Sequence, residues 1–257
     1  MIKNISVASY SFNSLLTEGM MDTFGYLESM RYRYNLATAD IWNGFVKDMS
    51  YDDVKKIRKA MDERGIFLAN LCCDWAHPWS ANPDELKVQH EMADKMLRFA
   101  EIMGAKTVRI DLGVREDEIT DAQFNYVAEK FAQYAKFGAQ AGFVVGPENH
   151  WGASRRLDVQ LRMHKEISSP NYGMLLHLGN WNLRDGETAD SNDLAAASIA
   201  VHTHIDYEHA LNAHEVLPAL KNAGYKGVWG VEHHKNVSVY NGVAAHLAMI
   251  AYADSCL

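Results

Sequence analysis

The chain has 257 residues, 48% of them hydrophobic, with 25 basic and 33 acidic residues and a formal net charge of −8. This length and composition suffice for one large core, so we expect a single domain over residues 1–257. An acidic chain without a basic cluster repels a phosphate backbone, which argues against a nucleic-acid partner.

The cysteines and the first residues of the chain bear on its compartment. The adjacent pair Cys72 and Cys73 and the distant Cys256 do not resemble the disulfide framework of a secreted domain. The opening residues MIKNISVASYSF become polar too early for a signal peptide, and no apolar stretch is long enough to cross a bilayer. We therefore expect a cytoplasmic protein without a membrane partner.

Eight short apolar runs, separated by helical patterns, predict eight strands. They lie at residues 5–12, 34–42, 66–74, 105–113, 143–151, 172–180, 199–206 and 227–234. The chain provides about 32 residues for each strand and its helix, the size of one βα unit. Continuous apolar strands that alternate with helices are typical of a parallel sheet covered on both faces.

The segments between these runs are amphipathic and stop at glycine. Residues 92–103 and 124–137 carry apolar side chains at helical spacing, which predicts helices packed on the sheet. Glycine just beyond a helix supplies the left-handed residue of a C-cap. The predicted helix ends are Gly65, Gly104, Gly142 and Gly224.

A closed barrel and an open doubly wound sheet both fit a parallel α/β pattern. The chain has no GxGxxG or GxxxxGK[ST] motif after an early strand, which disfavours the nucleotide-binding open sheet. Polar residues gather at the ends of most strands, not at a single switch point. The sequence therefore predicts an α/β fold made of a single (β/α)8 TIM barrel with parallel strands.

Four residues that can bind a metal lie toward the carboxyl ends of the last four runs, at nearly equal spacing. Glu148, His177, His204 and Glu232 are separated by 29, 27 and 28 residues. Two carboxylates and two imidazoles form a mixed oxygen and nitrogen site for one divalent ion. Mn²⁺, Co²⁺, Fe²⁺ and Zn²⁺ accept histidine readily, whereas Mg²⁺ prefers oxygen. We expect Mn²⁺, with the other four ions as alternatives.

Five segments of the chain resemble one known superfamily. These segments are LRFAEIMGAKTVRIDLG, GPENHWG, LLHLGNW, VHTHID and GVEHH. They are similar to strand ends of the xylose-isomerase-like TIM barrels, and within them to the sugar-phosphate isomerase and epimerase branch. That branch includes ketose 3-epimerases and hydroxypyruvate isomerase.

The resemblance assigns roles to the four spaced residues. It implies that Glu148 and Glu232 are metal ligands that also act as the catalytic acid/base pair. The ligand of the seventh strand corresponds best to His204, and His202 remains an alternative. On the sixth strand the family usually has aspartate, whereas this chain has His177, a difference that bears on the metal and on the reaction.

These parts suggest one chemistry. A divalent ion that chelates the carbonyl and a neighbouring hydroxyl of a sugar stabilises the enediolate formed when the adjacent C–H loses its proton. One glutamate removes this proton, and the other returns it to the opposite face or to the neighbouring carbon. The results are epimerisation and aldose–ketose isomerisation, respectively.

Aromatic and polar residues beyond the strand ends are candidates for the wall of a sugar-binding pocket. The candidate substrate-binding residues are Asp74, Trp75, His77, His150, Trp151, Arg155, Asn180, Trp181, His202 and His233. Arg109 and Asp111 alternate on one strand, and we expect them to form a structural ion pair in the lower barrel. The connection after the seventh strand lacks a glycine-rich phosphate cradle, which favours an unphosphorylated carbohydrate.

Other functions stay open at this point. A metal-dependent lyase or dehydratase would use the same first proton abstraction and then expel a leaving group. A DNA-repair endonuclease of the same superfamily needs a larger ligand set and a basic face, and a non-catalytic sugar-binding barrel would not need four ligands. A homodimer or homotetramer is also possible, because barrels of this kind often pair.

Overall fold

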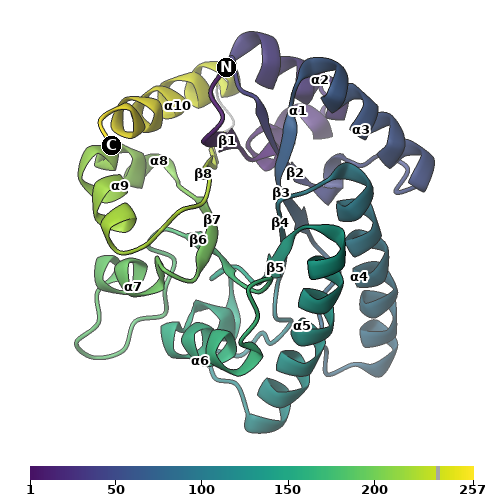
Figure 1. Ribbon diagram of the computed structural model, residues 1–257, viewed down its shortest axis with the longest axis vertical. Coiled ribbons are helices and arrows are strands. Elements are labelled where there is room, and N and C mark those ends of the chain that lie inside the picture. Colours follow the sequence, from purple (N-terminus) through teal and green to yellow (C-terminus); the bar gives the residue numbers. More distant parts are fainter. Residues whose placement is uncertain (236–237) are drawn as a thin grey trace.

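Eight parallel strands form a ring that is surrounded by helices (Figure 1), as shown by a computed structural model describing residues 1–235 and 238–257. The predicted fold class is confirmed. The strands are β1 (Ile5–Val7), β2 (Thr38–Trp42), β3 (Phe67–Cys73), β4 (Thr107–Ile110), β5 (Val144–Gly146), β6 (Met174–His177), β7 (Ala200–His204) and β8 (Trp229–Val231). Each of them lies inside one of the eight predicted runs.

Helices follow every strand and pack on the outside of the ring. They are α1 (Asn13–Thr17), α2 (Thr23–Glu28), α3 (Tyr51–Arg64), α4 (Pro83–Met103), α5 (Asp121–Ala141), α6 (Leu157–Ile167), α7 (Ala189–Ala196), α8 (Tyr207–Leu211), α9 (Ala213–Asn222) and α10 (Val239–Ser255). Short helical turns occupy η1 (Ser9–Phe12), η2 (Ser29–Arg33), η3 (Asn43–Phe45) and η4 (Gly152–Arg155). Within the described residues, no helix combines the length and the apolar character that crossing a membrane requires.

The pairing of strands closes the ring. One ladder joins β2, β3, β4 and β5, and two further parallel pairs join β1 with β8 and β6 with β7. Single bridges connect these groups: Ala8 with Asp40, Glu148 with Leu175, and Ile205 with Val231. Every strand therefore has a neighbour on both sides, and the carboxyl ends of all eight lie at one end of the barrel.

The helix ends follow the predicted chemistry. Gly65, Gly104 and Gly142 cap α3, α4 and α5 in the left-handed conformation, with φ values of 63°, 68° and 86°. Gly224 also has a positive φ, but it follows the αR cap of α9 at Ala223 by one residue. A left-handed residue costs little only for glycine, so these positions direct the chain from each helix into the next strand.

The first predicted strand is shorter than expected. Residues 5–12 were predicted to be extended throughout, but the chain turns into η1 after Ala8, where the amide of Ser11 donates to the carbonyl of Ala8 at 3.0 Å. The hydroxyl of Ser11 then accepts from the amide of His233 at 2.9 Å. These bonds fold the chain over the barrel end instead of continuing the strand.

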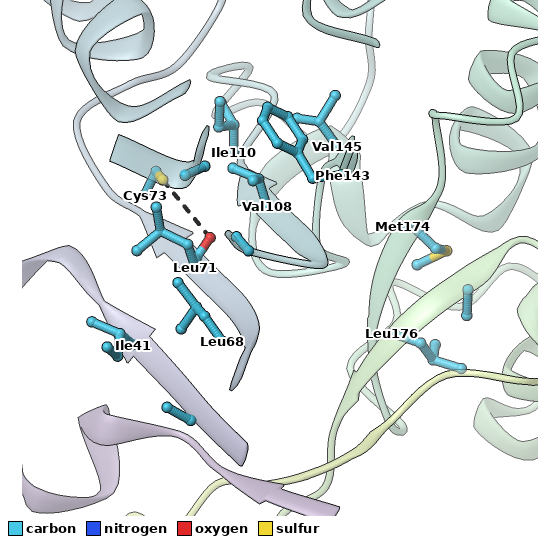
Figure 2. Close-up of a cluster of buried hydrophobic side chains, with 14 of the residues drawn as sticks. Ile41, Leu68, Leu71, Cys73, Val108, Ile110, Phe143, Val145, Met174 and Leu176 are labelled. Carbon is cyan, nitrogen blue, oxygen red and sulfur yellow. Dashed lines mark hydrogen bonds between the residues drawn. The ribbon is translucent and has the colours of Figure 1, made fainter. Parts of the chain in front are cut away.

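Side chains alternate along the strands between two environments. Apolar residues that face the helices form the core (Figure 2), and they include Ile41, Leu71, Cys73, Val108, Ile110, Val145, Met174 and Leu176. Several of the residues that alternate with them are polar and face the barrel interior: Asp40 bonds to Asn70 on β3 and to His202 across the barrel on β7. The core thus stabilises the ring from outside, while its interior is free to carry charged groups.

Gly146 on β5 has no room for a side chain, because a Cβ there would lie 1.6 Å from the carbonyl oxygen of Gly173. We expect Gly146→Ala to push β5 away from the chain that enters β6 and to lower the free energy of unfolding by about 2 to 3 kcal/mol. Urea unfolding measures this loss. Gly25→Ala is the matched control, because a Cβ at Gly25 meets no atom nearer than 3.5 Å. Equal stability of the two variants would contradict the close approach.

Candidate metal centre

The four predicted ligands stand at the ends of four successive strands. Glu148 lies two residues beyond β5, and Glu232 directly follows β8. His177 and His204 are the last residues of β6 and β7. One oxygen or nitrogen atom from each side chain lies within 4.8 Å of those of the others. The regular spacing along the chain therefore becomes a single cluster, because parallel strands end at the same edge of the barrel.

The two imidazoles face the two carboxylates across this cluster. Nδ1 of His177 lies 3.0 Å from Oε1 of Glu148 and 3.6 Å from Oε2 of Glu232. Nδ1 of His204 lies 3.6 Å and 3.4 Å from the same two oxygens. Each imidazole thus presents Nδ1, and each carboxylate presents one oxygen, to a common centre.

Asp40 on β2 contacts Nε2 of His204, the ring nitrogen that does not face the cluster. Its Oδ2 lies 3.1 Å from Nε2 of His204 and 2.8 Å from Nε2 of His202. The side-chain amide of Asn70 donates to its Oδ1 at 3.0 Å. A carboxylate behind an imidazole fixes the ring and the nitrogen that carries the proton. The two candidates on β7 are therefore placed differently: His204 belongs to the four-residue cluster, and His202 groups only with Asp40 and His204.

Arg109 on β4 connects Glu148 with two further carboxylates. Its Nη1 lies 2.7 Å from Oδ1 of Asp74 and 3.0 Å from Oδ2 of Asp111, and its Nε lies 3.2 Å from Oε2 of Glu148. The predicted ion pair with Asp111 is present, but its predicted place in the lower barrel is wrong. Arg109 lines the same cavity as Glu148, because the carboxylates that attract its guanidinium group all lie near the carboxyl ends of strands.

Charged neighbours counteract the effect of burial on the pKa values of the clustered residues. Burial alone would raise the pKa of Glu148 and of Glu232, but nearby positive groups hold both pKa values well below the usual range. His150 is the largest of these influences on Glu148, and His204 is the largest on Glu232. Burial would lower the pKa of His204, but Glu232 and Asp40 raise it well above its usual value. The glutamates are therefore ionised, and their field favours a cation between them.

The donor set fits a divalent metal ion. Two carboxylate oxygens and two imidazole nitrogens suit the borderline cations of the first transition series. Nδ1 of His204 is buried, faces both glutamates and has no hydrogen-bond partner within residues 1–235 and 238–257. A cation at the common centre would satisfy this nitrogen and would offset the cost of burying two carboxylates together.

The cluster lies against a cavity of about 240 Å³. Besides the four clustered residues, the cavity is lined by Ala8, Tyr10, Asp40, Trp42, Cys72, Asp74, Arg109, His150 and His234. Tyr10 packs edge-on against Trp42, with ring centroids 5.2 Å apart, and His234 stacks on His177 at 6.2 Å. A lining that combines aromatic rings with charged groups suits a ligand with both C–H faces and hydroxyls.

Two of the predicted substrate-binding residues line this cavity. Asp74 accepts a hydrogen bond from Nε1 of Trp42 at 2.7 Å and pairs with Arg109. Nδ1 of His150 lies 2.9 Å from Oδ2 of Asp111. Burial would lower the pKa of His150, but Glu148 and Asp111 raise it to about 9. Both residues therefore belong to the charged network around Glu148.

The tryptophans and the asparagine among the predicted substrate-binding residues lie outside the residues that line the cavity. Trp181 is buried, and its Nε1 donates to Oδ1 of Asp193 at 2.7 Å. Trp75 is 64% exposed. The side-chain amide of Asn180 donates to the main-chain carbonyl of Asn149 at 2.7 Å, which connects two loops. Trp151 packs edge-on against His77, with ring centroids 5.2 Å apart, so this pair also has a packing role.

The remaining predicted substrate-binding residues also lie elsewhere. Nη2 of Arg155 donates to the carbonyl of Trp181 at 3.3 Å. His202 is bound to Asp40, as described above, and His233 is buried with its ring centroid 6.1 Å from that of His246. Arg155 and His202 therefore have polar partners outside the cavity, whereas His233 packs against His246, and neither of its ring nitrogens has a hydrogen-bond partner among the described residues.

Seven lining residues were not predicted as site residues from the sequence: Ala8, Tyr10, Asp40, Trp42, Cys72, Arg109 and His234. Asp40 offered a signal, because a lone carboxylate inside the apolar run 34–42 needs a buried partner. Tyr10 offered none, since it reaches the cavity only through the turn at η1.

Solved structures share this architecture at low sequence identity. The 3-keto-D-glucoside 4-epimerase YcjR from E. coli has a TM-score of 0.73 at 14% identity, covering 99% of this chain and 100% of that protein. The D-psicose 3-epimerase from Clostridium cellulolyticum H10 has a TM-score of 0.76 at 14% identity, with coverages of 98% and 99%. The probable 3-DHS dehydratase AsbF from Bacillus anthracis has a TM-score of 0.72 at 12% identity, with coverages of 96% and 98%. At such identities these likenesses establish the fold.

The family comparison covers most of the chain. No curated protein matches it. The family described as xylose isomerase-like TIM barrel matches residues 30–251, a range that runs from the helical turn before β2 into α10 and includes all four clustered residues. The chain therefore belongs to the xylose isomerase-like TIM barrel family.

Proposed function

We propose that the protein is a divalent-metal-dependent sugar isomerase or epimerase that acts on a small, unphosphorylated ketose or aldose. One observation carries the proposal: two carboxylates and two imidazoles from β5 to β8 converge within 4.8 Å beside a cavity. Epimerases are among the solved structures with this fold, which supports the same reaction class. Mn²⁺ is the proposed ion because the donor set is half nitrogen.

The chemistry of such a reaction needs an electrophile and two proton carriers. A bound divalent ion polarises a carbonyl oxygen and stabilises the negative charge that develops on it. The carboxylates of Glu148 and Glu232 supply the proton carriers: one removes the proton from the carbon beside the carbonyl, and the other protonates the resulting enediolate. Both glutamates are ionised in the free protein, so either one can serve as the base, and the other takes up a proton from solvent before it acts as the acid.

The surroundings hold the two glutamates in different ways. Oε2 of Glu148 is held by Arg109, while Oε1 is directed toward the cluster. Oε2 of Glu232 lies 3.4 Å from Nε2 of His234, which stacks on His177. Held carboxylates lose little freedom when the substrate binds, so proton transfer occurs from fixed positions.

The charge of the cavity favours a neutral substrate. Its arginine, Arg109, is already paired with three carboxylates. A phosphate or carboxylate group would have to compete with these partners and would approach Glu148 and Glu232. The volume of about 240 Å³ suits a small ligand, and the rings of Tyr10 and Trp42 suit the C–H face of a sugar.

Glu148→Gln and Glu232→Gln test the roles of the two carboxylates. Glutamine keeps the size of the side chain but cannot accept the proton, so we expect each variant to lose at least about 100-fold in proton exchange at the substrate carbon. Deuterium uptake from D₂O by ketoses, aldoses, inososes and keto-glycosides, with Mn²⁺ present, measures this exchange. Glu166→Gln is the matched control, since Glu166 is exposed on α6.

The same assay separates the competing outcomes. Exchange with a new stereoisomer or aldose–ketose pair supports the proposal, whereas a dehydrated or cleaved product assigns the chain to a lyase. Unchanged exchange in both glutamine variants would remove these residues from proton transfer. No exchange by the unaltered protein on any of the sugars would overturn the proposed reaction.

His177→Asp tests the proposed effect of histidine on metal choice. The substitution replaces an imidazole by a third carboxylate, and Mg²⁺ prefers oxygen donors, so the affinity for Mg²⁺ relative to Mn²⁺ is expected to rise about tenfold or more. Calorimetric titration with each ion gives the two dissociation constants. His214→Asp is the control, because His214 is exposed on α9. A ratio that stays the same in both variants would show that His177 does not select the ion.

A further inference from the structure

A second potential metal-binding group adjoins the four-residue cluster. Asp111, Glu148 and His150 offer ligand atoms that lie within 4.8 Å of one another. Oδ1 of Asp111 is buried and has no hydrogen-bond partner among the described residues, so this group has an oxygen atom that is free to bind a metal ion. Because Glu148 belongs to both groups, its carboxylate is placed to bridge two ions, an arrangement known from two-metal sites.

Arg109 already supplies positive charge to this second group. Its guanidinium nitrogens lie 3.0 Å from Oδ2 of Asp111 and 3.2 Å from Oε2 of Glu148. An ion bound by these oxygens would sit about 2 Å from each of them. It would therefore compete with the guanidinium group for the same lone pairs and would meet a like charge at short range.

Arg109 is held in this position by contacts outside the group. Its side chain is 6% exposed, and its Nη1 lies 2.7 Å from Oδ1 of Asp74. The other oxygen of Asp74 accepts a hydrogen bond from Nε1 of Trp42 at 2.7 Å. A guanidinium group keeps its charge at any ordinary pH and cannot dissociate from the chain, so an incoming ion has no easy way to displace it.

We propose that Arg109 is a built-in cation that occupies a latent second metal site and restricts the centre to one ion. This inference rests on the proposed metal-dependent function. The two oxygens of Glu148 then have different roles. Oε2 is neutralised by the guanidinium group of Arg109, and Oε1 is left for the ion held with His177, His204 and Glu232. Arg109 is therefore a positioning residue that sets metal stoichiometry.

Arg109→Met tests the proposal by removing the charge while keeping an unbranched side chain. We expect the unaltered protein to bind one equivalent of Mn²⁺ and Arg109→Met to bind two, measured by equilibrium dialysis with metal analysis. Electron paramagnetic resonance gives an independent readout, because two Mn²⁺ ions bridged by one carboxylate are exchange-coupled and a single ion is not. The Arg109 variant should also gain thermal stability from the second equivalent.

Two further variants separate the site from general effects of losing an arginine. Arg156 is also buried and pairs with Glu118 at 2.8 Å, away from the residues of both groups. Arg156→Met should bind one equivalent, because it leaves the second group unchanged. Arg109→Lys should also bind one equivalent, because it keeps a positive charge beside Asp111 and Glu148.

Each outcome decides one claim. No bound Mn²⁺ in the unaltered protein overturns the proposed metal centre itself, whereas two equivalents in the unaltered protein overturn only the role of Arg109. One uncoupled equivalent in a folded Arg109→Met protein also overturns that role. If Arg109→Met folds only with two equivalents of Mn²⁺, the proposal is supported, and if neither it nor Arg109→Gln folds at any Mn²⁺ concentration, the latent site is refuted.

Discussion

The structure depends on how five carboxylates are accommodated inside one end of a barrel. Asp40, Asp74, Asp111, Glu148 and Glu232 all lie at or near the ends of strands and line or adjoin one cavity. Burying one ionised carboxylate without compensation costs several kcal/mol, and mutual repulsion adds to this cost. The arrangement is stable only because positive or proton-donating groups face every carboxylate.

The compensation is divided among distinct partners. Arg109 forms ion pairs with Asp74, Asp111 and one oxygen of Glu148. His202 and His204 on β7 pair with Asp40 through Nε2. Nδ1 of His177 and Nδ1 of His204 face Oε1 of Glu148 and Oε2 of Glu232. At that last point the compensating groups are imidazoles, which can lose their protons and bind a metal, whereas Arg109 keeps its charge; this difference is the reason to assign a metal ion there.

The fold makes this concentration of charge possible. Apolar side chains that face the helices form a core independent of the barrel interior (Figure 2), so stability does not require an apolar interior. Strands that are consecutive in the chain are neighbours in the ring, which places their ends side by side, and close approaches such as that of Gly146 to Gly173 keep β5 near β6. Function is thereby confined to one end of the ring, while the helices and the outer core carry the stability.

Sequence patterns were sufficient for the ring of strands and for the convergence of the four spaced residues, because strand ends in a parallel barrel meet at one edge. They were insufficient for side chains whose partners are remote: Asp40 meets His202 and His204, which follow it by 162 and 164 residues. The same reason explains Trp181, whose indole is bound by Asp193 on α7 and so lies away from the cavity. Arg109 illustrates a third case, in which the ion pair was predictable but its height in the barrel was not.

In the proposed metal centre, Glu148, His177, His204 and Glu232 hold one divalent ion. Anomalous scattering from crystals grown with MnCl₂, recorded on both sides of the manganese absorption edge, tests it directly. We expect one strong peak among these four residues, within about 2.3 Å of Nδ1 of both histidines and of one oxygen of each glutamate. The absence of a peak there, or a peak bound instead by Asp40 and His202, would rule out this ligand set.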